Sequence, residues 1–277
     1  MLPVWLKENV EGKSGLLTGT YVALMGTCVS ISLALAVPLA RATSIGWRLS
    51  MVPWIITGTI AAIWWAVKMP QSSHPKGRES EPHFFANPML KNRSAWALAF
   101  FFGIISMLFY ATSTWGPTIL ATKGFSLQGA SWVISGANFF GALVGIAIPH
   151  YLSKKSDMRW ALVAVSLFTA AGLLGVSLDR GNREIIWMSI AMTGMAIVFP
   201  LSLLLAVLKS TDPKQTRLLS IMMQSIGYVM AAFSPTILGK LFDLSGSWSK
   251  AMFFVVGLAA IQSFISYEVG KPSKITV

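Results

Sequence analysis

Long runs without Asp, Glu, Lys or Arg dominate the hydrophobic pattern of this chain. A helix that crosses the hydrocarbon layer of a membrane needs about 17 to 25 predominantly apolar residues. Runs of that length lie at 14–40, 49–67, 94–122, 124–153, 160–178, 185–208, 218–239 and 251–267. They are apolar on every side, whereas the strands of a membrane barrel alternate apolar and polar residues over about ten positions. The pattern therefore predicts an all-α transmembrane protein with eight spanning helices.

Composition and charge support this prediction and fix an orientation. Only 12% of the 277 residues are charged, against about 25% in an ordinary soluble domain. The net charge of +12 could indicate nucleic-acid binding, but the positions of the cations explain it differently. Fifteen of the 22 Lys and Arg lie on the side of the N-terminus, and the other side has Arg41, Arg48, Lys123, Arg180, Arg183, Lys240 and Lys250. Because cytoplasmic loops carry the excess of cations, both termini are predicted to be cytoplasmic, in a cell (inner or plasma) membrane, with no nucleic-acid partner.

The longest connection, 69–93, divides the chain. It contains four Pro and mixed charges, which is typical of a flexible cytoplasmic loop. It separates residues 1–68, interpreted as the last two helices of an N-terminal half, from 94–277, a six-helix C-terminal half. His74 and His83 lie in this loop without a third ligand nearby, and the lone Cys28 is predicted to be a small buried packing residue, so neither a metal site nor a cofactor is expected.

An internal repeat indicates that the chain is part of a longer protein. Aligning Trp47 with Trp248 also pairs Gly26 with Gly227. A carrier built from two parallel six-helix repeats at this spacing would have about 400 residues, with four helices before Met1. We therefore expect the missing N-terminal helices of the parent protein to be partners of this chain.

Three stretches of sequence resemble a known family. They are Phe109-Tyr110 before Trp115 and Pro117, then Phe199-Pro200-Leu201, and then Gln224-Ser225-x-Gly227-Tyr228 with Pro235 and Gly239. They are similar to the cyanate and 2-nitroimidazole transporter family of the major facilitator superfamily. The resemblance implies a helix bundle of that superfamily with eight of an expected twelve helices. It also implies a permease that moves a small polar or anionic organic solute across the lipid bilayer by alternating access.

Two positions depart from the family pattern. Gly116 stands where the family usually has Leu between Trp and Pro, which should loosen the bend at Pro117. Ser153 stands where the superfamily often has an acid in a loop between two helices. The family's Asn-Leu-Arg-Pro element, a contact for anions, is absent together with the first four helices.

Polar side chains inside the spans are the candidate site residues, because no charged residue lies within a span. Gln224 and Tyr228 lie one helical turn apart on one face, and Tyr110 lies on a similar stripe of 94–122. The candidates for the substrate path are Gln224, Tyr228, Tyr110, Asn138, Phe199 and Trp115, and those for helix bending are Pro117, Pro200 and Pro235. A second interpretation stays open: Gln224 and Asn138 join helices, and the hydroxyls bond backbone carbonyls one turn back.

Two other functions are alternatives to transport. An intramembrane enzyme would need a nucleophile with a base, or metal ligands, at membrane depth. The spans contain no acid, and His150 lies near the end of one of them, so we expect no enzyme. The other alternative is a non-functional fragment of a carrier. Since the solute site of such carriers lies between the two halves, we expect the 277-residue chain not to transport by itself.

Overall fold

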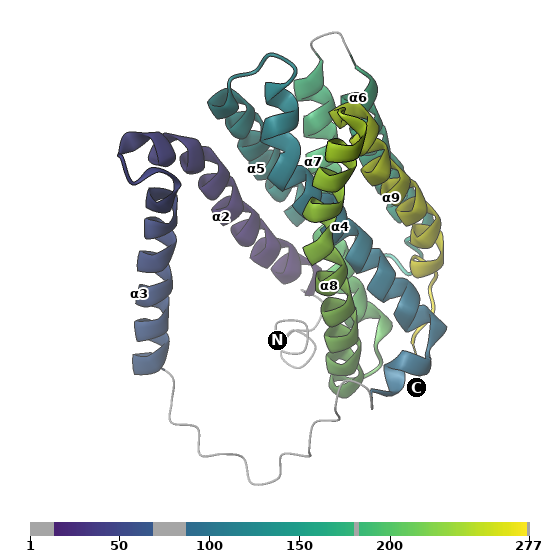
Figure 1. The fold of residues 1–277 in the computed structure, drawn as a ribbon. Helices are drawn as coiled ribbons and strands as arrows, with labels where there is room; N and C mark the ends of the chain where they lie inside the picture. Colours follow the sequence, from purple (N-terminus) through teal and green to yellow (C-terminus); the bar gives the residue numbers. More distant parts are fainter. Residues whose placement is uncertain (1–13, 69–86, 180–182, 276–277) are drawn as a thin grey trace.

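A computed structural model of the chain describes residues 14–68, 87–179 and 183–275, and these are almost entirely helical (Figure 1). The helices are α2 (Ser14–Ala42), η1 (Gly46–Met51), α3 (Val52–Lys68), η3 (Pro88–Lys91), α4 (Arg93–Ala121), α5 (Leu127–Leu152), α6 (Arg159–Leu178), α7 (Glu184–Lys209), α8 (Pro213–Ser245) and α9 (Trp248–Val269). Each predicted run corresponds to one of the eight long helices, and each helix is long and apolar enough to cross a membrane. The prediction of an all-α, multi-pass membrane fold is confirmed.

Several helices extend beyond the charge-free runs that predicted them, and α8 does so at both ends. Asp212 is its N-cap and Pro213 its first residue. The Gln215 backbone N–H donates to the Asp212 carboxylate at 2.8 Å and holds the pKa of that carboxyl below its usual range. At the other end, Gly246 adopts a left-handed conformation with φ 63° and stops the helix. Charged residues in terminal turns can reach the membrane surface, so a helix continues past the first charge.

Helices α4 to α9 form one packed block in which α4 and α7 are the most buried. Helix α4 packs on α8 and α9, and α7 packs on α5 and α6. Two residues of the predicted loop 69–93 pack on this block: the Asn87 side chain donates to the carbonyl of Leu218 at 2.9 Å, and Met89 is fully buried. The rest of the predicted loop, with His74 and His83, lies outside the described residues.

Helices α2 and α3 differ sharply in how they meet this block. Helix α2 runs along α5 and also contacts α7, whereas α3 lies beyond α2 at the edge of the molecule (Figure 1). None of the residues of α3 is buried. The expectation that Cys28 is buried was wrong, because it lies two residues from both Gly26 and Ser30 and therefore on the opposite side of α2 from α5.

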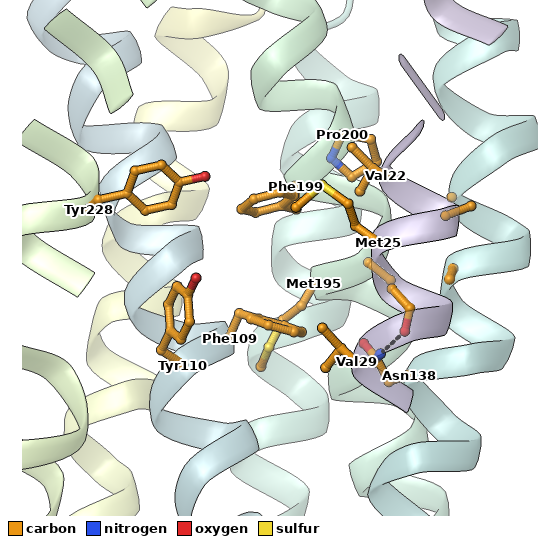
Figure 2. Close-up of a pocket in the computed structure, with 15 residues that line it drawn as sticks. Val22, Met25, Val29, Phe109, Tyr110, Asn138, Met195, Phe199, Pro200 and Tyr228 are labelled. Atoms are coloured by element: carbon orange, nitrogen blue, oxygen red, sulfur yellow. Dashed lines mark hydrogen bonds between the residues drawn. The ribbon is translucent and has the colours of Figure 1, made fainter. Parts of the chain in front are cut away.

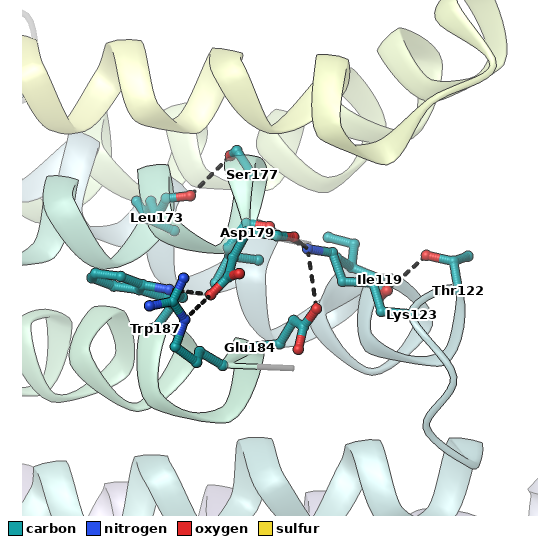
Figure 3. Close-up of polar contacts among 10 residues, drawn as sticks. Ile119, Thr122, Lys123, Leu173, Ser177, Asp179, Glu184 and Trp187 are labelled. Atoms are coloured by element: carbon teal, nitrogen blue, oxygen red, sulfur yellow. Dashed lines mark hydrogen bonds and ion pairs between the residues drawn. The ribbon is translucent and has the colours of Figure 1, made fainter. Parts of the chain in front are cut away.

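A cluster of charged and polar groups joins α4, α6 and α7 where α4 ends and α7 begins (Figure 3). The Lys123 ammonium donates to the carbonyls of Val176 and Asp179 at 2.7 and 3.0 Å, and lies 3.8 Å from the carboxylate of the buried Glu184. The Trp187 indole donates to the Asp179 carboxylate at 2.6 Å. Charged groups that lie outside the predicted spans thus hold three helix ends together.

Candidate functional site

A cavity lies between α2 and the block (Figure 2). Five helices line it: α2, α4, α5, α7 and α8. The lining residues are Val22, Ala23, Met25, Gly26, Val29, Phe109, Tyr110, Asn138, Ala142, Gly145, Met195, Ala196, Phe199, Pro200 and Tyr228. Four of the six candidates for the substrate path are among them, namely Tyr110, Asn138, Phe199 and Tyr228.

Aromatic rings form a continuous chain across this cavity. The Tyr228 ring meets Phe102 edge-on at 5.2 Å between ring centroids, and Phe102 packs on Phe199 at 5.5 Å. Phe199 in turn lies 6.5 Å from Phe109, whose ring meets Tyr110 edge-on at 5.7 Å. Such tilted and edge-on pairs stabilise one another beyond their buried area. Helices α4, α7 and α8 therefore present a packed aromatic surface with a tyrosine at each end.

The two tyrosine hydroxyls of this chain of rings remain accessible. The side chains of Tyr110 and Tyr228 are 44% and 39% exposed. Within the described part of the chain, neither hydroxyl has a hydrogen-bond partner. Figure 2 shows both rings on the side of the cavity that faces the α2 residues Met25 and Val29. These hydroxyls can therefore donate to, or accept from, a molecule in the cavity.

Asn138 lines the cavity but serves chiefly to join α5 to α2. Its amide donates to the carbonyl of Gly26 at 2.9 Å and to the hydroxyl of Ser30 at 3.0 Å. The neighbouring Ser135 donates to the carbonyl of Ser30 at 2.7 Å, and Trp132 to that of Ala34 at 3.2 Å. These bonds follow one another along both helices. For Asn138 the geometry favours the second interpretation of the sequence, in which the amide joins two helices.

Gln224 and Trp115 are not among the residues that line the cavity. Gln224 lies on α8, one turn before Tyr228, and is half-buried. The Trp115 indole donates to the carbonyl of Pro235 at 2.8 Å, and its ring packs on Trp248 at 5.0 Å. A Cβ added at Gly239 would lie 2.8 Å from the same ring. Trp115 therefore holds α4 against α8 and is not positioned to contact a molecule in the cavity.

The helices continue through all three prolines that were predicted to bend them. At Pro235 and Pro200, a neighbouring group lies beside the carbonyl oxygen that has lost its helical hydrogen bond. Pro235 leaves the carbonyl of Ala231 without its helical donor, and the Ser234 hydroxyl lies 2.9 Å from that oxygen. Pro200 does the same to Ala196, whose carbonyl oxygen would lie 2.6 Å from a Cβ added at Gly145. Gly145 and, one turn earlier, Gly141 thus let α5 approach the loosened turn of α7 closely. Bending at Pro117, Pro200 and Pro235 stays a prediction.

The sequence did not reveal the α2 wall of the cavity. Val22, Met25 and Val29 are ordinary apolar residues of a lipid-compatible helix, and nothing in their spacing separates them from Leu24 or Ile31. Gly26 was the one available signal, since a Cβ there would lie 3.0 Å from Ala142 of α5. Met195 of α7 is fully buried and lines the cavity as well.

Comparison with known proteins gives a consistent result. The family model of the Major Facilitator Superfamily matches residues 17–235. The chain is 26% identical to the uncharacterized transporter YycB of Bacillus subtilis over 273 residues, which cover 98% of the chain and 67% of the relative. It is also 26% identical to the 2-nitroimidazole transporter of Escherichia coli over 275 residues, covering 99% and 69%. The cyanate transport protein CynX of the same organism is 24% identical over 268 residues, covering 94% and 68%.

A solved structure agrees with these relatives in fold. The fucose:proton symporter FucP of E. coli superposes with a TM-score of 0.62 at 12% sequence identity, covering 98% of this chain and 86% of that one. The structural likeness, the eight apolar helices and the match over residues 17–235 agree with one another. The chain therefore belongs to the major facilitator superfamily of transporters.

Proposed function

We propose that this chain takes part in carrying a small polar or anionic organic solute by alternating access, and that the cavity between α2 and the block is on the path of the solute. The observation that carries the proposal is the pair of accessible hydroxyls, Tyr110 and Tyr228, on different helices around one aromatic surface. Carriers built from repeated bundles bind their solute where the bundles meet, and α2 meets the block along this cavity. Rocking of α2 against the block would open the cavity to each side in turn.

The chemistry of the lining favours one solute class as the first candidate. Relatives carry names that refer to 2-nitroimidazole and to cyanate. Phe109 and Phe199 offer ring faces to a flat molecule, and the hydroxyls of Tyr110 and Tyr228 can donate to acceptor atoms at its edge. A planar heteroaromatic such as 2-nitroimidazole uses both features, whereas cyanate uses only the hydroxyls. We therefore propose a nitroimidazole-like solute ahead of cyanate.

Binding to the purified chain tests the site apart from transport. Titration calorimetry with 2-nitroimidazole should show binding to the wild-type chain. Each of the substitutions Tyr110→Phe and Tyr228→Phe should weaken it about two- to thirteenfold, because a hydrogen bond contributes about 0.5 to 1.5 kcal/mol. Tyr151→Phe is the matched control, since Tyr151 lies at the end of α5 away from the cavity. Equal affinities in all three variants would remove the tyrosines from the proposed site.

The prediction that Gln224 lies on the substrate path can be tested in the same way. Gln224→Leu leaves the cavity lining unchanged, so we expect binding to stay within about twofold of the wild type if the path runs through the cavity as described. If Gln224→Leu weakened binding as much as Tyr228→Phe, Gln224 would be part of the substrate path.

We also propose that the protein lies in the cell (inner or plasma) membrane with both termini in the cytoplasm. The support is the excess of Lys and Arg in the loops on the N-terminal side. A periplasmic-active alkaline phosphatase fused after Val277 should be inactive, and the same reporter inserted after Ser44 should be active. The opposite pattern would invert the orientation. The proposed transport makes and breaks no covalent bond.

A further inference from the structure

A second pocket, with an empty volume of about 610 Å³, lies at the end of the block where α5, α7 and α9 end. The short connection after α5, the last turn of α7 and the segment after α9 surround it. Four lysines contribute to its lining, together with two serines and three apolar residues. The lining residues are Lys155, Ser156, Met158, Leu208, Lys209, Lys271, Pro272, Ser273 and Lys274. This is a concave and strongly basic surface.

The wall of this pocket is fixed by bonds between α7 and the segment after α9. The Lys209 ammonium donates to the carbonyls of Lys271 and Ser273 at 2.9 and 3.3 Å, and Lys209 is only 6% exposed. In the reverse direction, the Ile275 backbone N–H donates to the carbonyl of Lys209 at 2.8 Å, and the Lys274 ammonium to that of Leu208 at 2.6 Å. The lysines of the pocket are therefore held close to one another by the fold.

Few acids balance these cations. Glu268 pairs with Lys271 at 2.6 Å, and Asp157 pairs with Arg159 at 2.6 Å. Lys155, Lys209 and Lys274 have no acid within ion-pair distance in the described part of the chain. Cations gathered in a concave surface repel one another, and an anion between them would relieve that repulsion. The hydroxyls of Ser156 and Ser273 have no hydrogen-bond partner among the described residues and can donate to the same anion.

Exposed aromatic residues beside the pocket indicate its depth relative to the membrane. Trp160 is 71% exposed and Tyr151 61%, and the Trp160 ring meets Tyr267 edge-on at 5.5 Å. Lys155 lies over the Tyr151 ring at 5.3 Å, and Lys271 over the Tyr267 ring at 6.0 Å. Trp and Tyr concentrate at the level of the lipid headgroups, on both faces of a membrane. The basic pocket therefore lies at the level of the headgroups.

We propose that this basic pocket binds a phosphate-bearing anion through Lys155, Lys209, Lys274 and the serine hydroxyls. An anionic phospholipid headgroup and free inorganic phosphate present the same chemistry. The adjacent aromatic residues favour the headgroup, because basic pockets between transmembrane helices on the anionic leaflet are suited to it. Lipid bound here would join the ends of α5, α7 and α9 at a place separate from the cavity beside α2.

The test uses the full chain in micelles of a zwitterionic detergent. The probes are phosphatidylglycerol, phosphatidylcholine and inorganic phosphate, each titrated while the melting temperature is recorded and bound lipid is counted by native mass spectrometry. The variant is Lys155→Gln with Lys274→Gln, which leaves the buried Lys209 in place. The matched control is Lys240→Gln with Lys250→Gln, two exposed lysines at the opposite end of the helices. If the double variant is already unfolded before any probe is added, the single variant Lys155→Gln is used in its place.

Phosphatidylglycerol should bind and raise the melting temperature of the wild type and of the control, and phosphatidylcholine should do neither. The double variant should bind phosphatidylglycerol about 25-fold more weakly, since each near-surface cation contributes about fivefold. Protection by phosphatidylglycerol alone assigns the headgroup as the source, and equal protection by inorganic phosphate assigns the free anion. Unchanged binding in the double variant, or no preference over phosphatidylcholine, would overturn the proposal.

Discussion

Helices α2 and α3 follow one another in the chain, and both lie in segments that are long and apolar enough to cross a membrane. Yet α2 packs along the block and α3 is exposed along its whole length. Hydropathy does not explain this difference in packing. Lipid tails are as apolar as Leu, so an apolar surface gains little by leaving lipid for a neighbouring helix.

Small residues and hydrogen bonds make the difference. Helix α2 places Gly19 and Gly26 against α5, and its carbonyls at Gly26 and Ser30 accept bonds from α5 side chains. In α3, Gly58 has nothing within 4 Å of an added Cβ, and the Thr57 hydroxyl bonds carbonyls of its own helix. A polar group whose hydrogen bonds are all made within its own helix does not join that helix to another. The difference between α2 and α3 predicts the outcomes of several substitutions.

The largest effect is expected from adding a side chain where α2 and α5 approach each other most closely. A Cβ at Gly19 would lie 3.0 Å from the Cα of Ile146 and 3.1 Å from the carbonyl oxygen of Gly145, both backbone atoms that cannot move aside. Gly19→Leu should lower the stability of the folded chain by about 1 to 3 kcal/mol. The measurement is the thermal melting of the purified chain in detergent. Gly58→Leu is the matched change in α3 and should leave the melting temperature unchanged, and a similar loss in both would contradict the account.

A smaller effect is expected from removing the amide that joins α5 to α2. Asn138→Leu deletes the donors to the carbonyl of Gly26 and the hydroxyl of Ser30, which should cost about 0.6 to 1.7 kcal/mol. Denaturation by a strong detergent, followed by circular dichroism, measures the change. Thr57→Val in α3 removes a hydroxyl that bonds only its own helix, and we expect no loss there. If Asn138→Leu lowered the stability no more than Thr57→Val does, the amide would not hold the helices together.

The smallest effect concerns the Trp132 indole, which donates to the carbonyl of Ala34 at 3.2 Å. Pro38 leaves that carbonyl without its helical donor. Trp132→Phe should therefore cost about 0.5 kcal/mol, and this cost should vanish in a Pro38→Ala background, where the helix supplies the donor again. A double-mutant cycle on melting temperature measures the coupling. Two additive changes would mean that the indole and the proline act independently.

The number of long helices and the positions of their apolar spans could be predicted from the sequence because charge-free runs of this length follow directly from the thickness of the membrane. The ends of α8 could not be predicted, because its terminal turns carry charged residues beyond the apolar run. Much of the aromatic side of the cavity could be predicted too, since Tyr110, Phe199 and Tyr228 stand in recognisable motifs. The hydrogen-bond partner of each polar side chain could not be predicted. Asn138 suited both interpretations, a residue of the substrate path or one that joins two helices, and its bond to Gly26 favours the second. Trp115 was a candidate for the substrate path, and its bond to Pro235 was not predicted. The α2 wall carries no polar group, so no pattern distinguished it from a lipid-facing surface.

The central claim is that the solute path runs between α2 and the block, and neighbouring residues of α2 test it most directly. Met25 lines the cavity, whereas Leu24 is 64% exposed and does not. In a Cys28→Ala background, Met25→Cys and Leu24→Cys would each be treated in membranes with a charged, water-soluble maleimide. We predict that the cysteine at position 25 is labelled, that 2-nitroimidazole slows this labelling, and that the cysteine at position 24 stays unlabelled. Equal labelling at the two positions, with no effect of solute at either, would contradict the account.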